Sequence, residues 1–431
     1  MTDSLTVWWD SAIVGSLSLH RHGAARFTYD RDWIQDTATP PISFSLPKGP
    51  ESFSPRLCLP FFEGLLPEGT QRDGAAAGLG VSPANTFRLL AGLGAEVAGA
   101  LSLLPEGEDP RDTETEPVPE ALSVDELAGV LETIRQRPFL TGIAKGPGSH
   151  VRGAADGLRM SLAGAQSKIP VVLVHGRIAL PVPGQATTHI LKPPMLGLEA
   201  TTENEAFAMC LAADLGLAVA PVRPRVVAGM PYLLVERYDR LPAPQGPVKR
   251  LHQEDFCQAL GIVPQRKYAA DGGPGSPHCF DLIRRVCTRP AIAVLGLLDA
   301  AILQVLLGNA DAHGKNYSLL RQPDGDVGLA PLYDLLSTIA YPRFSTRLAM
   351  KVAGRGTLQE FRHGDWDRFA RQCGLGAPFV RQRVGELCDQ ASERSSAVAE
   401  ALVLPGLDQD ALAKQAARVE NRATLLARTV P

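Results

Sequence analysis

The sequence lacks the cysteine patterns that mark zinc-binding and disulfide-rich proteins. Its 431 residues contain seven cysteines, an odd number, and no two of them form a C-x-x-C pair. Zinc sites and small secreted domains both depend on paired or closely spaced cysteines. We therefore expect reduced core cysteines in a cytoplasmic protein, without zinc and without disulfides.

The chain also lacks a large net charge, a leader segment and a long apolar run. A net charge of -3 gives no general attraction for nucleic acid, so contact with DNA would require a basic patch or a partner. The first residues do not join a basic region to an apolar one. The apolar run over residues 291–307 is short for a membrane span and contains the charged Asp299. Neither secretion nor a membrane anchor is expected.

The composition is that of an ordinary globular protein, with 45% hydrophobic and 21% charged residues. The chain is long enough for two or three domains. We expect a strand-rich N-terminal unit at 1–105, an acidic proline-rich linker at 106–121, a strand-containing lobe at 122–238 and a helical lobe at 239–431. Strands before helices is the order of a two-lobed α+β protein-kinase-like fold. Strands are expected at 5–9, 13–19, 26–29, 169–174, 177–180, 187–192 and 232–235, and helices at 86–93, 253–260, 277–287, 291–307, 365–373, 378–402 and 408–428.

A polar cluster follows the apolar run, over residues 308–317. Within it Asp311 and Asn316 reproduce the D-x-x-x-x-N spacing of phosphotransferase catalytic loops, in which the aspartate accepts the proton of the acceptor hydroxyl and the asparagine holds magnesium. Asp334 would supply a second oxygen ligand from a separate segment. The cluster predicts a magnesium-dependent phosphotransferase. Because Asp and Asn are also ordinary turn residues, a plain loop is the alternative.

Residues 161–168 form a stretch of mostly small side chains ahead of an expected hairpin. Small residues allow backbone N–H groups to approach phosphate oxygens closely, as in the loops with which kinases cover ATP. Only one glycine, Gly164, stands where a G-x-G-x-x-G loop would have three. The stretch is therefore either a phosphate-binding loop or a plain turn.

Two more segments fit the order of a kinase. Lys192 ends the expected strand at 187–192, where kinases present a lysine to the α- and β-phosphates, although a solvated surface lysine is the alternative. Glu205 in the next helix either pairs with Lys192 or completes a capping box with Thr202. The buried strand at 232–235 leads into residues 236–239, a charged segment suited to a hinge whose backbone hydrogen-bonds adenine.

Five motifs together resemble the HipA family of bacterial toxin serine/threonine kinases, and these motifs occupy residues 161–168, 189–192, 235–240, 252–255 and 308–316. The resemblance covers nearly the whole chain, since residues 65–69 are similar to the N-terminal subdomain of that family. It implies a kinase-like fold with an N-terminal addition, use of ATP and Mg²⁺, and transfer of the γ-phosphate to a protein serine or threonine, for example in an aminoacyl-tRNA synthetase. It also implies a HipB-like helix-turn-helix antitoxin that inhibits the toxin and carries the pair to operator DNA.

The resemblance assigns roles to single residues. Asp311 would be the catalytic base, Lys192 the phosphate-binding lysine, and Asn316 and Asp334 the magnesium ligands. Ser161 would be a site of inhibitory autophosphorylation. Further ATP contacts would come from the phosphate loop, the hinge and the catalytic loop, namely from Ala163, Gly164, Ala165, Gln166, Lys168, Glu236, Tyr238, Asp239 and His313. Ser167 departs from the pattern of the family, because some relatives are expected to have an acidic residue at this position.

Two other functions remain open. A small-molecule phosphotransferase would share the spacing of Asp311 and Asn316, although its residues around the phosphate loop differ from those found here. A catalytically silent corepressor would have lost the base or a metal ligand, whereas Lys192, Asp311, Asn316 and Asp334 are all present.

Overall fold

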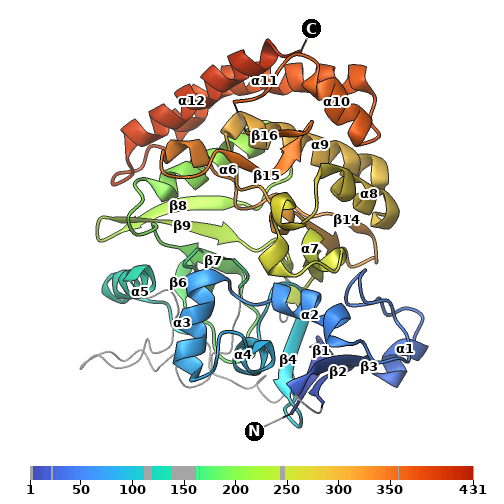
Figure 1. The fold of residues 1–431 in the computed structure, drawn as a ribbon. Helices are drawn as coiled ribbons and strands as arrows, with labels where there is room; N and C mark the ends of the chain where they lie inside the picture. The colour runs from blue at the N-terminus through green and yellow to red at the C-terminus, as the bar shows by residue number, and fades with distance from the viewer. Residues whose placement is uncertain are drawn as a thin grey trace. The chain divides into compact units, whose positions relative to one another are not determined.

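The computed structural model describes residues 3–20, 23–110, 119–136, 162–164, 166–242, 248–357 and 359–430 (Figure 1). Contacts between residues divide the chain into two compact units. The first unit comprises Met1–Leu196 and Asp239–Pro264, and the second comprises Gly197–Tyr238 and Gln265–Pro431. Much of the expected linker, residues 111–118, lies outside the described residues, and the predicted domain boundaries stay predictions.

The first unit begins with a four-stranded antiparallel sheet in the order β3-β2-β1-β4. Leu5 and Val7 of its first strand are fully buried, and Thr6 between them is half-buried, because successive side chains of a strand point to opposite faces. The three strands expected at the N-terminus are confirmed. The strands of this sheet are β1 (Ser4–Trp9), β2 (Ala12–Leu19), β3 (Ala25–Tyr29) and β4 (Leu101–Pro105).

Between β3 and β4 the chain forms α1 (Arg31–Gln35), α2 (Pro55–Gly64), α3 (Gly69–Leu79) and α4 (Thr86–Leu93). Phe61 and Phe62 of α2 are fully buried in the same apolar cluster as Phe27 of β3. The ring centroids of Phe27 and Phe62 lie 5.3 Å apart. Aromatic packing therefore fixes α2 against the sheet, and with it the start of the segment that leads to α3.

The rest of the first unit includes six more strands, and among them β5 pairs antiparallel with both β6 and β7. The helix α5 begins with a capping box, in which Ser123 Oγ accepts from the Glu126 N–H at 3.2 Å and the Glu126 carboxylate accepts from the Ser123 N–H at 2.8 Å. The elements are α5 (Val124–Gln136), β5 (Ile169–Val174), β6 (Arg177–Ala179), β7 (His189–Lys192), β10 (Arg240–Leu241), β11 (Lys249–Arg250), β12 (Gln253–Asp255) and α7 (Phe256–Ala259).

The helix predicted at 253–260 is wrong for its first three residues, which form β12. The Asp255 carboxylate accepts from the Gln258 N–H at 2.9 Å, and the Gln258 side chain accepts from the Asp255 N–H at 2.8 Å. This capping box lets the helix begin only after Asp255.

The second unit contains the β8–β9 hairpin and the longest helices of the described residues, and its helices α11 and α12 lie side by side (Figure 1). The long helices predicted for the C-terminal half are confirmed to within about two residues at each end. The elements are α6 (Thr201–Asp214), β8 (Val222–Val227), β9 (Met230–Glu236), α8 (Ser276–Val286), α9 (Pro290–Leu307), β13 (Ser318–Arg321), β14 (Val327–Leu329), β15 (Arg347–Val352), β16 (Arg355–Thr357), α10 (Asp365–Gln372), α11 (Ala377–Ala401) and α12 (Gln409–Ala427).

The single charge in α9 is paired inside the second unit. Asp299 is buried, and its two carboxylate oxygens accept from Arg383 Nε at 2.6 Å and Arg383 Nη2 at 2.9 Å. By length and composition α9 could cross a membrane, but most of the helix is buried in the structure. One such helix is weak evidence for a span, because buried core helices have the same composition.

All seven cysteines are free thiols, and six of them are buried. Burial raises the pKa of the Cys58 thiol to about 11 and that of the Cys388 thiol to about 12. These thiols stay protonated at neutral pH, as inert core cysteines do.

Candidate active site

The helix α9 ends at Gly308, and the loop predicted to be catalytic follows directly. Gly308 has a φ of +71°, and its N–H bonds back to the carbonyls of Gln304 and Val305. This left-handed helix end favours glycine. A Cβ at this position would also overlap the Ile339 side chain. The glycine therefore allows the chain to leave the helix directly into the polar cluster.

Hydrogen bonds from two other segments fix the first residues of the loop. The Ala310 N–H donates to Thr338 Oγ1 at 2.8 Å, and the Thr338 hydroxyl donates to the Gly308 carbonyl at 3.0 Å. The Ala349 N–H donates to the Ala310 carbonyl at 2.8 Å. Asn309 Oδ1 accepts from the Asp311 N–H at 2.9 Å. Asp311 itself is exposed, whereas residues 312–317 are buried, so its carboxylate is accessible on a rigid loop.

The two predicted magnesium ligands lie together in the second unit. Asn316 Nδ2 donates to Asp334 Oδ2 at 3.3 Å, and Asn316 Oδ1 accepts from the His313 N–H at 3.3 Å. Asp334 has a φ of +59°, a conformation that is uncommon outside glycine and often found at functional sites. Carboxylate and amide oxygens are the ligands that magnesium prefers.

The donor set fits magnesium better than a metal held by protein alone. Among the residues that the structure describes, no group of three or more His, Cys, Asp or Glu side chains is suited to a metal ion. Magnesium commonly takes one or two protein ligands and completes its shell with phosphate oxygens and water. Asn316 and Asp334 match that pattern.

Tyr268 is a site residue that the sequence analysis missed. Its hydroxyl donates to Asp311 Oδ1 at 2.9 Å. Its ring meets the His313 ring edge-on, with centroids 5.3 Å apart, and Lys267 Nζ lies 5.4 Å from the centroid of the same ring. The signal available in the sequence was an aromatic residue after two basic ones in a loop, which no motif spacing connects to Asp311.

The helix α6 holds the segment that follows Asp334. Asn204 Nδ2 donates to the Ser337 carbonyl at 2.9 Å, and the Ser337 N–H donates to Asn204 Oδ1 at 2.8 Å. This amide pair is fully buried, so it fixes the helix and the metal-ligand segment against each other within the second unit.

Of the two alternatives for Glu205, the capping box with Thr202 is wrong. α6 begins at Thr201 after Ala200, which has a left-handed φ of +50° and makes no side-chain cap bond. Thr202 is therefore inside the helix, so it cannot cap it. Glu205 is buried at 3% exposure, and its predicted pairing with Lys192 stays a prediction.

The predicted hinge residues belong to two units. Residues 236–238 lie in the second unit, and Asp239 lies in the first. Glu236 is exposed at the end of β9, and its N–H donates to the Pro221 carbonyl at 2.8 Å. Tyr238 stacks on Tyr333, with centroids 5.8 Å apart, and the Tyr333 hydroxyl donates to the Lys315 carbonyl at 2.7 Å. The hinge is thereby linked to the residues on either side of the metal ligands.

In the first unit the described part of the phosphate loop is held by the N-terminal helices. Gly164 forms an isolated bridge with Pro67, and the Gly164 carbonyl accepts from the Glu68 N–H at 3.1 Å. Gln71 Nε2 donates to Ser167 Oγ at 3.0 Å. The other predicted loop residues in the described part are all half-buried, and they are Ala163, Gln166 and Lys168. Ser161 and Ala165 lie outside the described residues.

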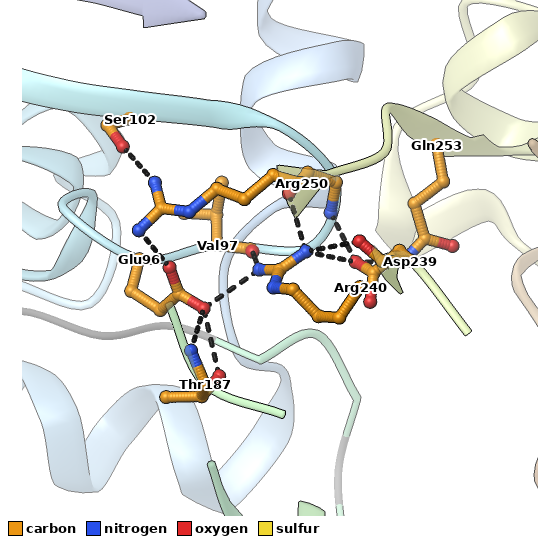
Figure 2. Close-up of polar contacts among 9 residues, drawn as sticks. Glu96, Val97, Ser102, Thr187, Asp239, Arg240, Arg250 and Gln253 are labelled. Carbon is orange, nitrogen blue, oxygen red and sulfur yellow. Dashed lines mark hydrogen bonds and ion pairs between the residues drawn. The ribbon is translucent and has the colours of Figure 1, made fainter. Parts of the chain in front are cut away.

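Lys192 and Asp239 are both buried in the first unit. Lys192 ends β7 and is 6% exposed, so the alternative of a solvated surface lysine is wrong. Asp239 Oδ2 accepts from the Gly99 N–H at 2.8 Å and from Gln253 Nε2 at 3.1 Å (Figure 2). The Asp239 side chain is thus hydrogen-bonded to other protein groups. The expected contact of Asp239 with the nucleotide stays a prediction, and it would come from the Asp239 backbone.

Comparison with known proteins identifies the family of this chain. Residues 5–104 match the model of the HipA N-terminal domain, and residues 160–395 match that of the HipA-like C-terminal domain. The chain belongs to the HipA family. It is 52% identical to Y4mE of Sinorhizobium fredii over 92% of both chains, a relative whose name marks its kinase assignment as provisional. It is 31% identical to the serine/threonine-protein kinase toxin HipA of Shewanella oneidensis, over 89% of this chain and 85% of that one.

A solved structure of Shewanella oneidensis HipA, in a complex with HipB and its operator DNA, has the same fold. It aligns with a TM-score of 0.83 at 26% identity and covers 99% of this chain and 100% of that chain. The HipA-like, kinase-like α+β fold that the motifs implied is confirmed.

Proposed function

We propose that this HipA-family protein is a toxin serine/threonine kinase that transfers the γ-phosphate of ATP to a protein side chain. The observation that carries the proposal is the arrangement in the second unit. There an exposed Asp311 receives a hydrogen bond from Tyr268, on the same loop whose Asn316 contacts Asp334. Kinase catalytic loops have this division between a base and a metal ligand.

Asp311 would orient the acceptor hydroxyl and take its proton as the oxygen attacks phosphorus. Asn316 and Asp334 would hold Mg²⁺, which neutralises charge on the β- and γ-phosphates when it is bound. Lys192 would pair with the α- and β-phosphates, and Gly164 and its neighbours would cover the phosphates with backbone N–H groups. The exposure of Asp311 suits an acceptor presented on a second protein.

Regulation would follow the pattern of the family. A HipB-like antitoxin would bind and inhibit the protein and would carry it to operator DNA. The solved complex of Shewanella oneidensis HipA with HipB and operator DNA supports such a partner. Autophosphorylation of Ser161 would add a charge of about -1.5 to -2 beside the phosphate loop and would repel ATP. The loop would then leave the nucleotide, and transfer would stop.

The proposal is tested with purified protein, labelled ATP, Mg²⁺ and a bacterial extract. We expect label on serine or threonine of at least one extract protein, and none with Asp311→Ala. Label found only in small molecules would contradict the protein-kinase proposal and favour the small-molecule alternative. Nucleotide binding without any transfer would favour the silent corepressor.

A further inference from the structure

A buried group of four charged side chains lies in the first unit, and the proposed reaction does not use it. Glu96, between α4 and β4, contacts Arg240 at 2.8 Å and Arg250 at 2.6 Å. Asp239 joins through a 3.0 Å contact with Arg240 (Figure 2). The four side chains are between 2% and 11% exposed. We call these four residues the Glu96 cluster.

The Glu96 cluster reaches the segment that leads to the phosphate-binding lysine. The N–H and the hydroxyl of Thr187 both donate to Glu96 Oε1, at 3.3 and 2.9 Å. Thr187 is fully buried and stands just ahead of β7, the strand that ends in Lys192. A short extended strand transmits a displacement at one end to the other, because its backbone is nearly fully stretched.

The cluster also holds the residues that follow Tyr238. Arg240 Nη1 donates to the Gly99 carbonyl at 3.0 Å and to the Asp239 carbonyl at 2.9 Å, and Arg240 Nη2 donates to the Val97 carbonyl at 3.3 Å. The Gly99 N–H donates in return to Asp239 Oδ2 at 2.8 Å. Residues 96–99 thus bind the end of the predicted hinge through backbone and side chain.

The charges of the cluster balance, with two carboxylates facing two guanidinium groups. A buried ion network of this kind adds little net stability compared with an apolar core, because desolvation offsets the attraction. Its contribution is a fixed geometry, since each guanidinium has several directed donors. Removal of one carboxylate leaves buried positive charge without compensation, and the segments around it shift.

We propose that Glu96 is a positioning residue for nucleotide binding, through which the N-terminal domain fixes both the strand of Lys192 and the end of the hinge. The inference rests on the proposed use of ATP by Lys192 and the hinge. It predicts that loss of the cluster weakens nucleotide binding, because the two segments must then be ordered when the nucleotide binds.

The test measures the affinity of the full-length protein for a non-hydrolysable ATP analogue with Mg²⁺ by calorimetry, well below the unfolding temperature. We expect Glu96→Gln to weaken binding by about tenfold, as for loss of one hydrogen bond to a charged group. Glu254→Gln is the matched control, since Glu254 is a buried carboxylate of the same unit that accepts from Ser43 Oγ at 2.6 Å and the Phe44 N–H at 3.0 Å. It should lower the unfolding temperature and keep the affinity.

Thr187→Val removes the hydroxyl and keeps the shape of the side chain. It is the second test variant, for use if Glu96→Gln does not fold. We expect about a threefold loss of affinity from one missing hydrogen bond. Unchanged affinity in a folded Glu96→Gln or Thr187→Val protein would overturn the inference, as would an equal loss in Glu254→Gln. Absence of nucleotide binding by the unaltered protein would instead overturn the proposed function, and the inference with it.

Discussion

The predicted catalytic loop of the second unit has several local hydrogen bonds, whereas the predicted nucleotide segments of the first unit are held by residues that are far away in the sequence. In this loop, Asn309 Oδ1 accepts from the Asp311 N–H, two residues away, and Asn316 Oδ1 accepts from the His313 N–H, three residues away. In the first unit, Glu96 holds Thr187 across 91 residues of sequence and Arg240 across 144. The predicted catalytic loop thus combines such local bonds with bonds from Thr338 and Ala349 of its own unit, whereas the predicted nucleotide segments are held by residues of the N-terminal domain.

This difference predicts that substitutions in the two regions have different kinetic signatures. Changes in the catalytic loop should lower the rate of transfer with little effect on nucleotide affinity. Changes in the first-unit segments should weaken nucleotide binding first. Four substitutions, in order of decreasing expected effect, test that separation.

Asp311→Ala should have the largest effect, because it removes the proposed base that would take the proton of the acceptor hydroxyl. Loss of a general base lowers transfer by about 10²–10⁴-fold. Affinity for the ATP analogue should stay within about twofold, since Asp311 does not hold the nucleotide. Single-turnover kinetics and calorimetry give the two values. Asp324→Ala, an exposed carboxylate in the β13–β14 turn, should behave like the parent.

Lys192→Met should weaken nucleotide binding by about 10- to 100-fold, because methionine fills the space and loses the charge-assisted bonds to phosphate. Lys249→Met is the control, as Lys249 is an exposed lysine of the same unit. The comparison between the regions would fail if Lys192→Met lowered the transfer rate and left the affinity unchanged.

Gly308→Ala should destabilise the protein by about 1–2 kcal/mol, because alanine is strained at positive φ. It should also slow transfer, since the added Cβ would displace Ile339 and move the loop. Gly325→Ala provides the matched control, with a φ of +89° and open space for a Cβ. Chemical denaturation should show a lower free energy of unfolding for both variants, and the larger loss for Gly308→Ala, because only its Cβ meets another side chain. A slowed rate in Gly325→Ala would contradict this interpretation.

Tyr268→Phe should have the smallest effect, about a fivefold loss of transfer rate, because one hydrogen bond to the Asp311 carboxylate disappears. In an Asp311→Ala background the same change should have no further effect, since the partner is already absent. Tyr341→Phe removes a hydroxyl that lies 3.1 Å from Asn204 and should not alter transfer beyond about twofold. Additive losses in the double variant would show that Tyr268 acts on something other than Asp311.

Most of the fold was predictable because its signals are local. The strands of the N-terminal sheet follow from their apolar runs and alternation, and the Ser123–Glu126 capping box and α9 were readable from a few adjacent residues. The start of α7 was predicted three residues too early. Asp255 caps the helix, so the helix begins at Phe256, and residues 253–255 form β12. Apolar periodicity alone does not place a helix end.

The candidate site was predictable only where a motif spacing existed. Asn316 and Asp334, the two predicted ligands, are in contact, and their role in holding magnesium stays a prediction. Tyr268 lies 43 residues from Asp311 in the sequence, and Glu96 lies in a loop with no motif of its own. Such partners are selected by tertiary packing, which a single sequence does not reveal.

We propose that this protein phosphorylates other proteins and that the transfer depends on Asp311. The most direct measurement is a phosphoproteome of bacteria after brief induced expression of the parent or of Asp311→Ala without an antitoxin. We expect new phosphoserine or phosphothreonine on at least one host protein with the parent only, together with growth arrest. Identical phosphoproteomes from the two forms, both expressed and folded, would contradict it.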